Sequence, residues 1–219
     1  MSGFKDASLN RLIAVKSLDF IVDKVLQCLE MMREDCAVYS KKIANNEIVI
    51  RDYLYCNYLD NDTVRQSIGL DTFIFIPEAP ENYIDNKPVG RADLKIIGFE
   101  TFRHSKRYFI IECKRIDGEL TLNRKYINEG IRRFVGDSPK YHSNYGISCI
   151  LGFVVKNIDI SKNVDNINGL LRTDYSDIHV HEYLHAGTVQ NTYISSHGLS
   201  DVNRVRLNHA FSDCSSMVG

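Results

Sequence analysis

Two stretches decide how this sequence is interpreted: Gly90-Arg91-Ala92-Asp93-Leu94-Lys95-Ile96-Ile97 and Arg107-Tyr108-Phe109-Ile110-Ile111-Glu112-Cys113-Lys114-Arg115. Both have the apolar, β-branched character of strands, yet both carry charged residues that strands usually avoid. In a strand the side chains alternate between faces, so Glu112 and Lys114 share one face and Cys113 lies on the other. A neighbouring strand with Asp93 would bring a second carboxylate beside Glu112. Two carboxylates and an ammonium at the edge of a sheet suit a hard divalent cation and an anionic substrate.

This arrangement resembles the PD-(D/E)XK nuclease superfamily, which has the restriction-endonuclease-like fold. The matching residues are Asp93 and, after 18 intervening residues, Glu112-x-Lys114, each preceded by a hydrophobic run. Ala92 stands where the family commonly has proline, a position that varies among its members. The resemblance covers roughly residues 45–155.

The hydrophobic periodicity predicts an α/β fold formed by one domain, residues 1–219. An amphipathic helix at 8–33, with Ser8 near its N-cap, lies in an N-terminal helical extension, 1–42. The core, 43–156, follows the order α-β-β-β-α-β around a central mixed sheet, which is also the order of the family it resembles. The C-terminal extension, 157–219, is less regular, with strands expected at 178–184 and 191–195 and either a helix or a strand at 203–212. The first core element is a helix at 43–59 that starts afresh near Asn45-Asn46-Glu47. Strands follow at 72–76, which Pro77 and Pro80 stop, and at 92–97 and 108–113. The core ends with a helix at 122–135, which ends at Gly136, and a strand at 148–155.

The resemblance implies Mg²⁺-dependent hydrolysis of phosphodiester bonds, with Mn²⁺ as a substitute. Asp93, Glu112 and the carbonyl of Cys113 would hold the metal, and Lys114 would act either on the attacking water or as a fixed positive charge. Families of this kind often add an acid from the helix before the sheet. Glu47 is the first choice for that acid, ahead of Asp52 and Glu34. Two plainer interpretations stay open, in which Glu47 is an acid favoured by the helix dipole and the other three form a salt bridge on an exposed strand.

The charge distribution favours a polyanionic substrate close to these residues. The whole chain has a net charge of −1, but residues 91–140 contain 12 Lys and Arg against 7 Asp and Glu. Such an excess would let a phosphodiester approach the carboxylates, and Arg91, Arg115 and Arg133 are the predicted nucleic-acid contacts. Tyr126, Glu129 and Arg133 have the spacing of one helix face, which is either directed at the site or solvated by water.

A competing motif, His181-Glu182-Tyr183-Leu184-His185, matches the H-E-x-x-H signature of zinc hydrolases. The residues before it alternate in the manner of a strand, and in a strand the two histidines would lie about 13 Å apart, too far to share one ion. We therefore expect the histidines to finish a sheet edge or to contact nucleic acid.

The resemblance thus implies an endonuclease acting on DNA in preference to RNA, with prokaryotic defence as the setting. A homodimer or a regulatory partner protein, docked on the N-terminal helix, would control cleavage. One alternative is a catalytically silent nucleic-acid-binding or assembly module of the same fold. A less favoured alternative is a zinc hydrolase built on His181, Glu182 and His185. A cytoplasmic location is expected for three reasons. The six cysteines lack C-x-x-C spacing, no apolar run is long enough to span a membrane, and the sequence has no signal-peptide pattern.

Overall fold

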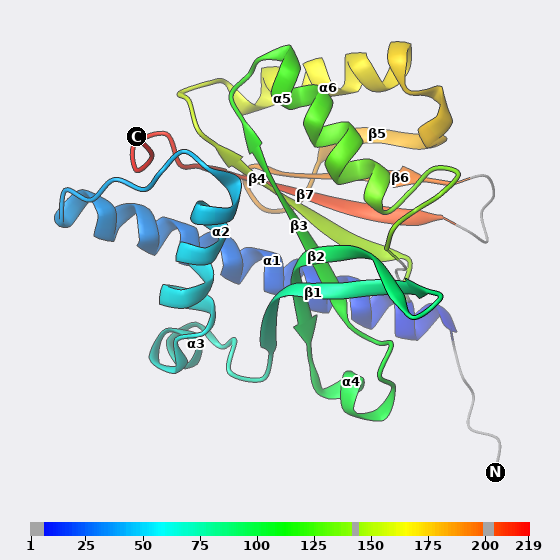
Figure 1. Ribbon diagram of the computed structural model, residues 1–219, viewed down its shortest axis with the longest axis horizontal. Coiled ribbons are helices and arrows are strands. Elements are labelled where there is room, and N and C mark those ends of the chain that lie inside the picture. Colours follow the sequence, from blue (N-terminus) through cyan, green and yellow to red (C-terminus); the bar gives the residue numbers. More distant parts are fainter. Residues whose placement is uncertain (1–6, 142–144, 199–203) are drawn as a thin grey trace.

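The computed structural model describes residues 7–141, 145–198 and 204–219. The side chains of residues 7–9, 82, 102 and 103 are not described, so the predicted N-cap at Ser8 lies outside the described side chains. The described residues form a mixed α/β fold around a seven-stranded sheet (Figure 1). The helices are α1 (Ala7–Val38), α2 (Glu47–Leu54), α3 (Asp62–Ile68), α4 (Phe99–Arg103), α5 (Leu120–Lys125) and α6 (Ile160–Asp174). The strands are β1 (Ile74–Ile84), β2 (Lys87–Ile97), β3 (Phe109–Ile116), β4 (Ile147–Val154), β5 (Val180–Ala186), β6 (Thr192–His197) and β7 (Val205–Asp213).

The strands lie in the order β1-β2-β3-β4-β7-β6-β5. β1, β2 and β3 pair antiparallel, β3, β4 and β7 pair parallel, and β7, β6 and β5 pair antiparallel. The prediction of a central mixed sheet is confirmed, and strands were correctly expected near 92–97, 108–113, 148–155, 178–184 and 191–195. For 203–212 the structure selects the strand.

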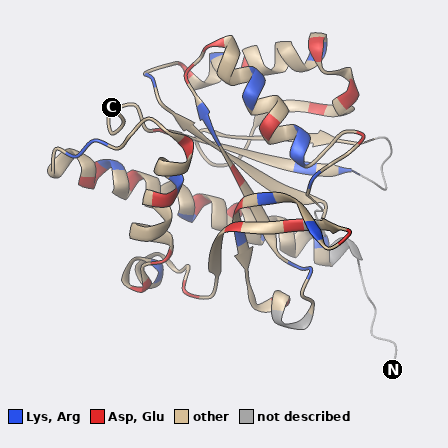
Figure 2. Cartoon of the chain, viewed as in Figure 1, with Lys and Arg blue, Asp and Glu red and all other residues tan. Residues whose placement is uncertain are grey.

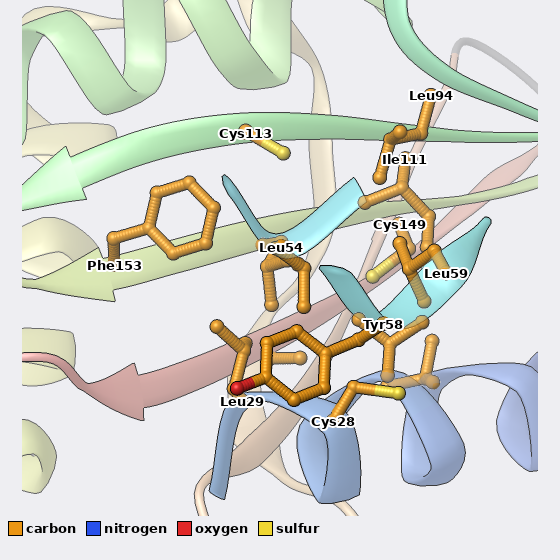
Figure 3. Close-up of a cluster of buried hydrophobic side chains, with 14 of the residues drawn as sticks. Cys28, Leu29, Leu54, Tyr58, Leu59, Leu94, Ile111, Cys113, Cys149 and Phe153 are labelled. Atoms are coloured by element: carbon orange, nitrogen blue, oxygen red, sulfur yellow. The ribbon is translucent and has the colours of Figure 1, made fainter. Parts of the chain in front are cut away.

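The two faces of the sheet are covered by different helices, and each has its own core cluster. α1 lies across one face and α5 and α6 across the other (Figure 1). Cys113 projects from β3 into the α1 side, where Leu54 of α2 and Leu29 of α1 also pack (Figure 3). Because side chains alternate along β3, Glu112 and Lys114 lie on the opposite face, toward α5.

α1 is amphipathic, as predicted, but its apolar stripe is part of the core. Leu18, Ile21, Val25 and Leu29 are almost fully buried, and the helix contacts β4 and β7. This stripe is therefore not available for docking a partner protein. No helix in the described ranges is long and apolar enough to cross a membrane.

Several predicted boundaries were wrong for identifiable reasons. Within the helix expected at 43–59, the fresh start predicted near Asn45-Asn46-Glu47 is confirmed, since α2 begins at Glu47 and the Asn46 side chain accepts hydrogen bonds from the N–H groups of Ile48 and Val49. The four residues before Glu47 are not helical. β1 continues to Ile84 instead of stopping at Pro77, because it is an edge strand, where prolines are tolerated. The helix after β3 begins at Leu120 and changes to a π-helical turn at Tyr126–Gly130 and a 3₁₀ turn at Ile131–Arg133.

Candidate functional site: a buried lysine among three carboxylates

Three carboxylates from separate elements surround the ammonium group of Lys114. Its Nζ lies 2.9 Å from Glu112 Oε1 on β3, 3.0 Å from Glu47 Oε1 at the start of α2 and 3.8 Å from Asp93 Oδ2 on β2. It also donates a 2.6 Å hydrogen bond to the carbonyl oxygen of Cys113. Figure 2 shows charges of both signs on β3 and on the neighbouring elements. The structure thus brings together all four residues that were predicted to be catalytic.

Asp93 is held in place by two donors. Its Oδ2 accepts a 2.7 Å hydrogen bond from the backbone N–H of Cys113, and its Oδ1 accepts one of 2.7 Å from Arg51 Nη1. Arg51 is only 2% exposed and also binds Asp52 and Glu78. The carboxylates around Arg51 outweigh the effect of burial and raise its pKa, so this guanidinium stays charged.

Glu112 is the most buried acid of the site, with 2% of its side chain exposed. Its Oε1 accepts from Lys114 and lies 3.0 Å from Nε of Arg133, while its Oε2 lies 3.0 Å from the Tyr141 hydroxyl. That hydroxyl donates at 2.5 Å to the carbonyl oxygen of Arg91, and it has only one hydrogen. Burial, with a further contribution from Asp93, raises the pKa of Glu112 to about 7 against the opposing effect of Lys114 and Arg133. The single hydroxyl proton of Tyr141 can therefore serve either the Arg91 carbonyl or Glu112 Oε2, but not both at once.

Lys114 is a permanently charged group in this arrangement. Burial alone would lower its pKa, but Glu112, Glu47 and Asp93 outweigh burial and raise the pKa above the ordinary value. Its stem packs where Gly130 leaves room, since a Cβ on Gly130 would lie 3.4 Å from Lys114 Cγ. The interpretation of these residues as an exposed strand-end salt bridge does not match the structure, because both members of the Glu112–Lys114 pair are buried.

Glu47 reaches the site because α2 begins beside β3. Its Oε2 accepts a 3.0 Å hydrogen bond from the backbone N–H of Arg115, so both carboxylate oxygens contact the β3 segment. The two other acids considered for this role differ in position. Asp52 pairs with Arg51 at the border of the site, whereas Glu34 lies on α1, on the far side of the sheet.

The three predicted nucleic-acid contacts differ in how far they are engaged within the protein. Arg91 is exposed on β2, and its guanidinium donates to the backbone carbonyl of Glu78. Arg115 donates to the backbone and side-chain oxygens of Asn45. Arg133 contacts Glu112, so part of its charge is used within the site.

The face predicted for Tyr126, Glu129 and Arg133 is not formed. Tyr126 is fully buried and pairs with His209, because the π-helical turn changes the helical spacing after it. Arg133 binds the backbone carbonyl of the exposed Glu129 in place of its side chain.

The donor set fits a hard divalent cation in chemistry and in charge, although these side chains are not arranged around an ion. Carboxylate and carbonyl oxygens are the ligands that Mg²⁺ prefers. The linked network has an excess of two negative charges when ionised, with five carboxylates (Asp93, Glu112, Glu47, Asp52 and Glu78) against three cations (Arg51, Lys114 and Arg133). Within the described residues no three His, Cys, Asp or Glu side chains converge as a coordination group. A metal ion would therefore compete with Lys114 for Glu112 and with Arg51 for Asp93.

The H-E-x-x-H segment does not form a metal site in this fold. His181 and His185 lie on β5, an edge strand, as the alternation of the sequence predicted. Four residues along a strand correspond to about 13 Å, so the histidines cannot bind one ion together.

Sequence reasoning missed Arg51 and Tyr141, which contact the predicted acids. Arg51 lies four residues after Glu47 and therefore on the same face of α2, a spacing that could have indicated it. No local pattern marks Tyr141, which reaches Glu112 from the segment between the 3₁₀ turn and β4.

Comparisons with known proteins give no relative: no family model matches the chain, and no curated protein or solved structure has significant similarity to it.

Proposed function

We propose that this protein is a metal-dependent DNA endonuclease of the PD-(D/E)XK type. The observation that carries the proposal is the convergence of Asp93, Glu112, Glu47 and the Cys113 carbonyl on Lys114. The order of elements supports it, since the helical segment from α2 is followed by three antiparallel strands, a helix and a parallel strand.

Each residue of the candidate site would have a separate role in the reaction. Asp93, Glu112 and the Cys113 carbonyl would hold Mg²⁺ or Mn²⁺, which supplies charge neutralisation and an acidified water molecule when bound. Lys114, whose pKa the three acids raise in the metal-free network, would either act as a positive charge toward the phosphate or position the attacking water. Arg91, the most exposed of the three arginines, would contact the phosphate backbone.

One observation favours a second candidate, a catalytically silent DNA-binding module of the same fold. In the network each oxygen of Asp93 and Glu112 already has a partner within the protein, so an ion is not needed to satisfy them. The two candidates differ in whether DNA bound by the protein is also cleaved.

Cleavage of supercoiled and linear DNA with Mg²⁺ or Mn²⁺ tests the proposal. We expect cleavage that EDTA abolishes and that Lys114→Ala reduces by at least about 100-fold, the scale of losing one charge-stabilising group. Lys162→Ala, on the exposed start of α6, is the matched control and should retain wild-type activity. Circular dichroism checks that both variants are folded.

A second measurement keeps metal binding separate from activity. Titration of Mn²⁺, followed by its electron paramagnetic resonance signal, should show binding to the wild type and weaker binding to Asp93→Asn. DNA binding without cleavage, together with no Mn²⁺ binding, would reject the nuclease and leave the silent module. Cleavage that survives Lys114→Ala would show that the reaction takes place elsewhere.

A further inference from the structure

A second cluster of basic residues lies on the opposite face of the sheet from Lys114. It surrounds a cavity of about 390 Å³ between the start of α1 and the β5-β6-β7 strands, lined by Ile194 and by Arg11, Arg204, Arg206, His185, Glu182 and Ser196. On this side α1 packs mainly against β4 and β7. Arg11, Glu182 and His185 are exposed, so the cluster is open to solvent.

The pairing of the strands places this cluster on the α1 side of the sheet. Ser196 of β6 lies opposite Arg206 of β7 and Glu182 of β5, so the three side chains form a row across the strands. Arg206 contacts Asp19 of α1 at 3.2 Å, which fixes the face on which the row lies. Lys114, in contrast, packs against Gly130 on the α5 side.

The charges of the cavity suit an anion. Its lining has three guanidinium groups and one carboxylate, and the nearby Asp19 pairs with one of them. Arg11 donates to the backbone carbonyl of Arg204 and has no carboxylate partner among the described residues. Guanidinium groups bind both carboxylate and phosphate oxygens through two parallel N–H donors, and the higher charge of a phosphate group gains more from several cations around one cavity.

Ser196 gives an independent indication of a ligand. The residue is 7% exposed, and its hydroxyl has no hydrogen-bond partner among the described residues. Buried hydroxyls are nearly always hydrogen-bonded, because an unpaired one costs about 1–3 kcal/mol. A buried hydroxyl without a hydrogen-bond partner, next to several arginines, is expected in a binding site where the ligand accepts the hydrogen bond.

We propose that Arg11, Arg206 and Ser196 form a binding site for a phosphate group, independent of the candidate catalytic site. The phosphate belongs either to a small phosphorylated compound or to the backbone of a nucleic acid. Arg11 and Arg206 provide the charge, and Ser196 donates its hydroxyl proton to a phosphate oxygen. The proposal does not depend on nuclease activity.

Calorimetric titration of the whole protein with inorganic pyrophosphate, in metal-free buffer, tests the site. We expect saturable binding that Arg11→Gln weakens about tenfold and Ser196→Ala a few-fold, the scale of one hydrogen bond to a charged group. Arg33→Gln, a matched change on α1 at an arginine paired with Glu30, should leave the affinity unchanged. Lys114→Ala should also leave it unchanged, because Lys114 lies on the other face.

The outcomes separate the possibilities. No saturable binding, or equal affinity in Arg11→Gln and Arg33→Gln, would overturn the proposal. Loss of binding in Lys114→Ala alone would overturn it too, since pyrophosphate would then occupy the candidate catalytic site. With the site established, displacement of pyrophosphate by a 12-nucleotide single-stranded DNA would identify a nucleic-acid backbone as the ligand. Independent binding of the two would identify a small phosphorylated compound.

Discussion

Replacement of Arg51 by methionine removes a buried cation that three carboxylates share. Asp52 and Glu78 are about half exposed, 49% and 48%, so water can replace the guanidinium there and each loss should be below about 1 kcal/mol. Asp93 is only 15% exposed, and its Oδ1 would lose its donor while its Oδ2 kept the N–H of Cys113. Leaving that oxygen unpaired should cost about 1–3 kcal/mol. Together these terms predict a loss of about 3 kcal/mol, the low end for a broken buried ion pair.

Urea unfolding followed by circular dichroism measures this loss. For a slope of about 2–3 kcal/mol per molar urea, the unfolding midpoint of Arg51→Met should fall by about 1 M. Arg124→Met is the matched control, because Arg124 pairs with Asp174 on the surface with 49% of its side chain exposed. Its midpoint should change by less than about 0.3 M.

The double variant Arg51→Met with Asp93→Asn tests whether the cost arises where the structure places it. Because neutral asparagine needs no counter-charge, the two changes should be less than additive by about 1 kcal/mol or more. An Arg51→Met midpoint equal to that of Arg124→Met, or strict additivity in the double variant, would refute the view that Arg51 holds Asp93.

Three further predictions concern stability and can be measured by the same unfolding assay. Burial lowers the pKa of His197 to about 4 and also lowers that of His209. The unfolded chain therefore takes up protons near pH 6.5 that the folded protein does not, so stability should be complete above pH 6.5 and fall by about 2 kcal/mol at pH 5 for His197 alone. The raised pKa of Glu112 acts in the opposite direction between pH 7 and pH 5, so the fall is measured in the Glu112→Gln variant, where an unchanged midpoint would contradict it. Gly152→Ala should cost about 1–3 kcal/mol because its Cβ would overlap the ring of Phe211, and a neutral result would show that the ring can move away. Gly169→Ala, where a Cβ meets nothing within 4 Å, should stabilise α6 by about 0.5–1 kcal/mol, and a lower midpoint would contradict the open surroundings of that position.

Local periodicity was sufficient to predict the elements that carry the site. α1 follows from apolar residues three and four apart, and β3 follows from a β-branched run with one apolar face. The shared face of Glu112 and Lys114 is a direct consequence of alternation in that strand. The approach of Asp93 follows as well, because β2 and β3 are consecutive and pair antiparallel.

The helix α6 and the partner of β7, which the sequence did not predict, depend on contacts between residues distant in sequence. α6 contains Asn163 and Asn168, which disfavour helix, but both are buried and hydrogen-bonded, the first to Asn123 and the second to the backbone of Leu184. β7 pairs with β4 across more than 50 residues, and no local pattern specifies that partner. The contact of Tyr141 with Glu112 has the same origin, since it requires the completed sheet and the π-helical turn together.

The hydrogen bonds and the charge balance around Lys114 favour different candidate functions. Complete hydrogen bonding of Asp93 and Glu112 would suit a module that has no use for a metal, because such a network stabilises itself. Charge balance points the other way. With every acid ionised, five linked carboxylates against three cations leave two uncompensated negative charges, and the raised pKa of Glu112, about 7, reduces this excess near neutral pH. A bound divalent cation would offset the excess and favour the ionised form of Glu112, which supports the proposed metal-dependent function over the silent module.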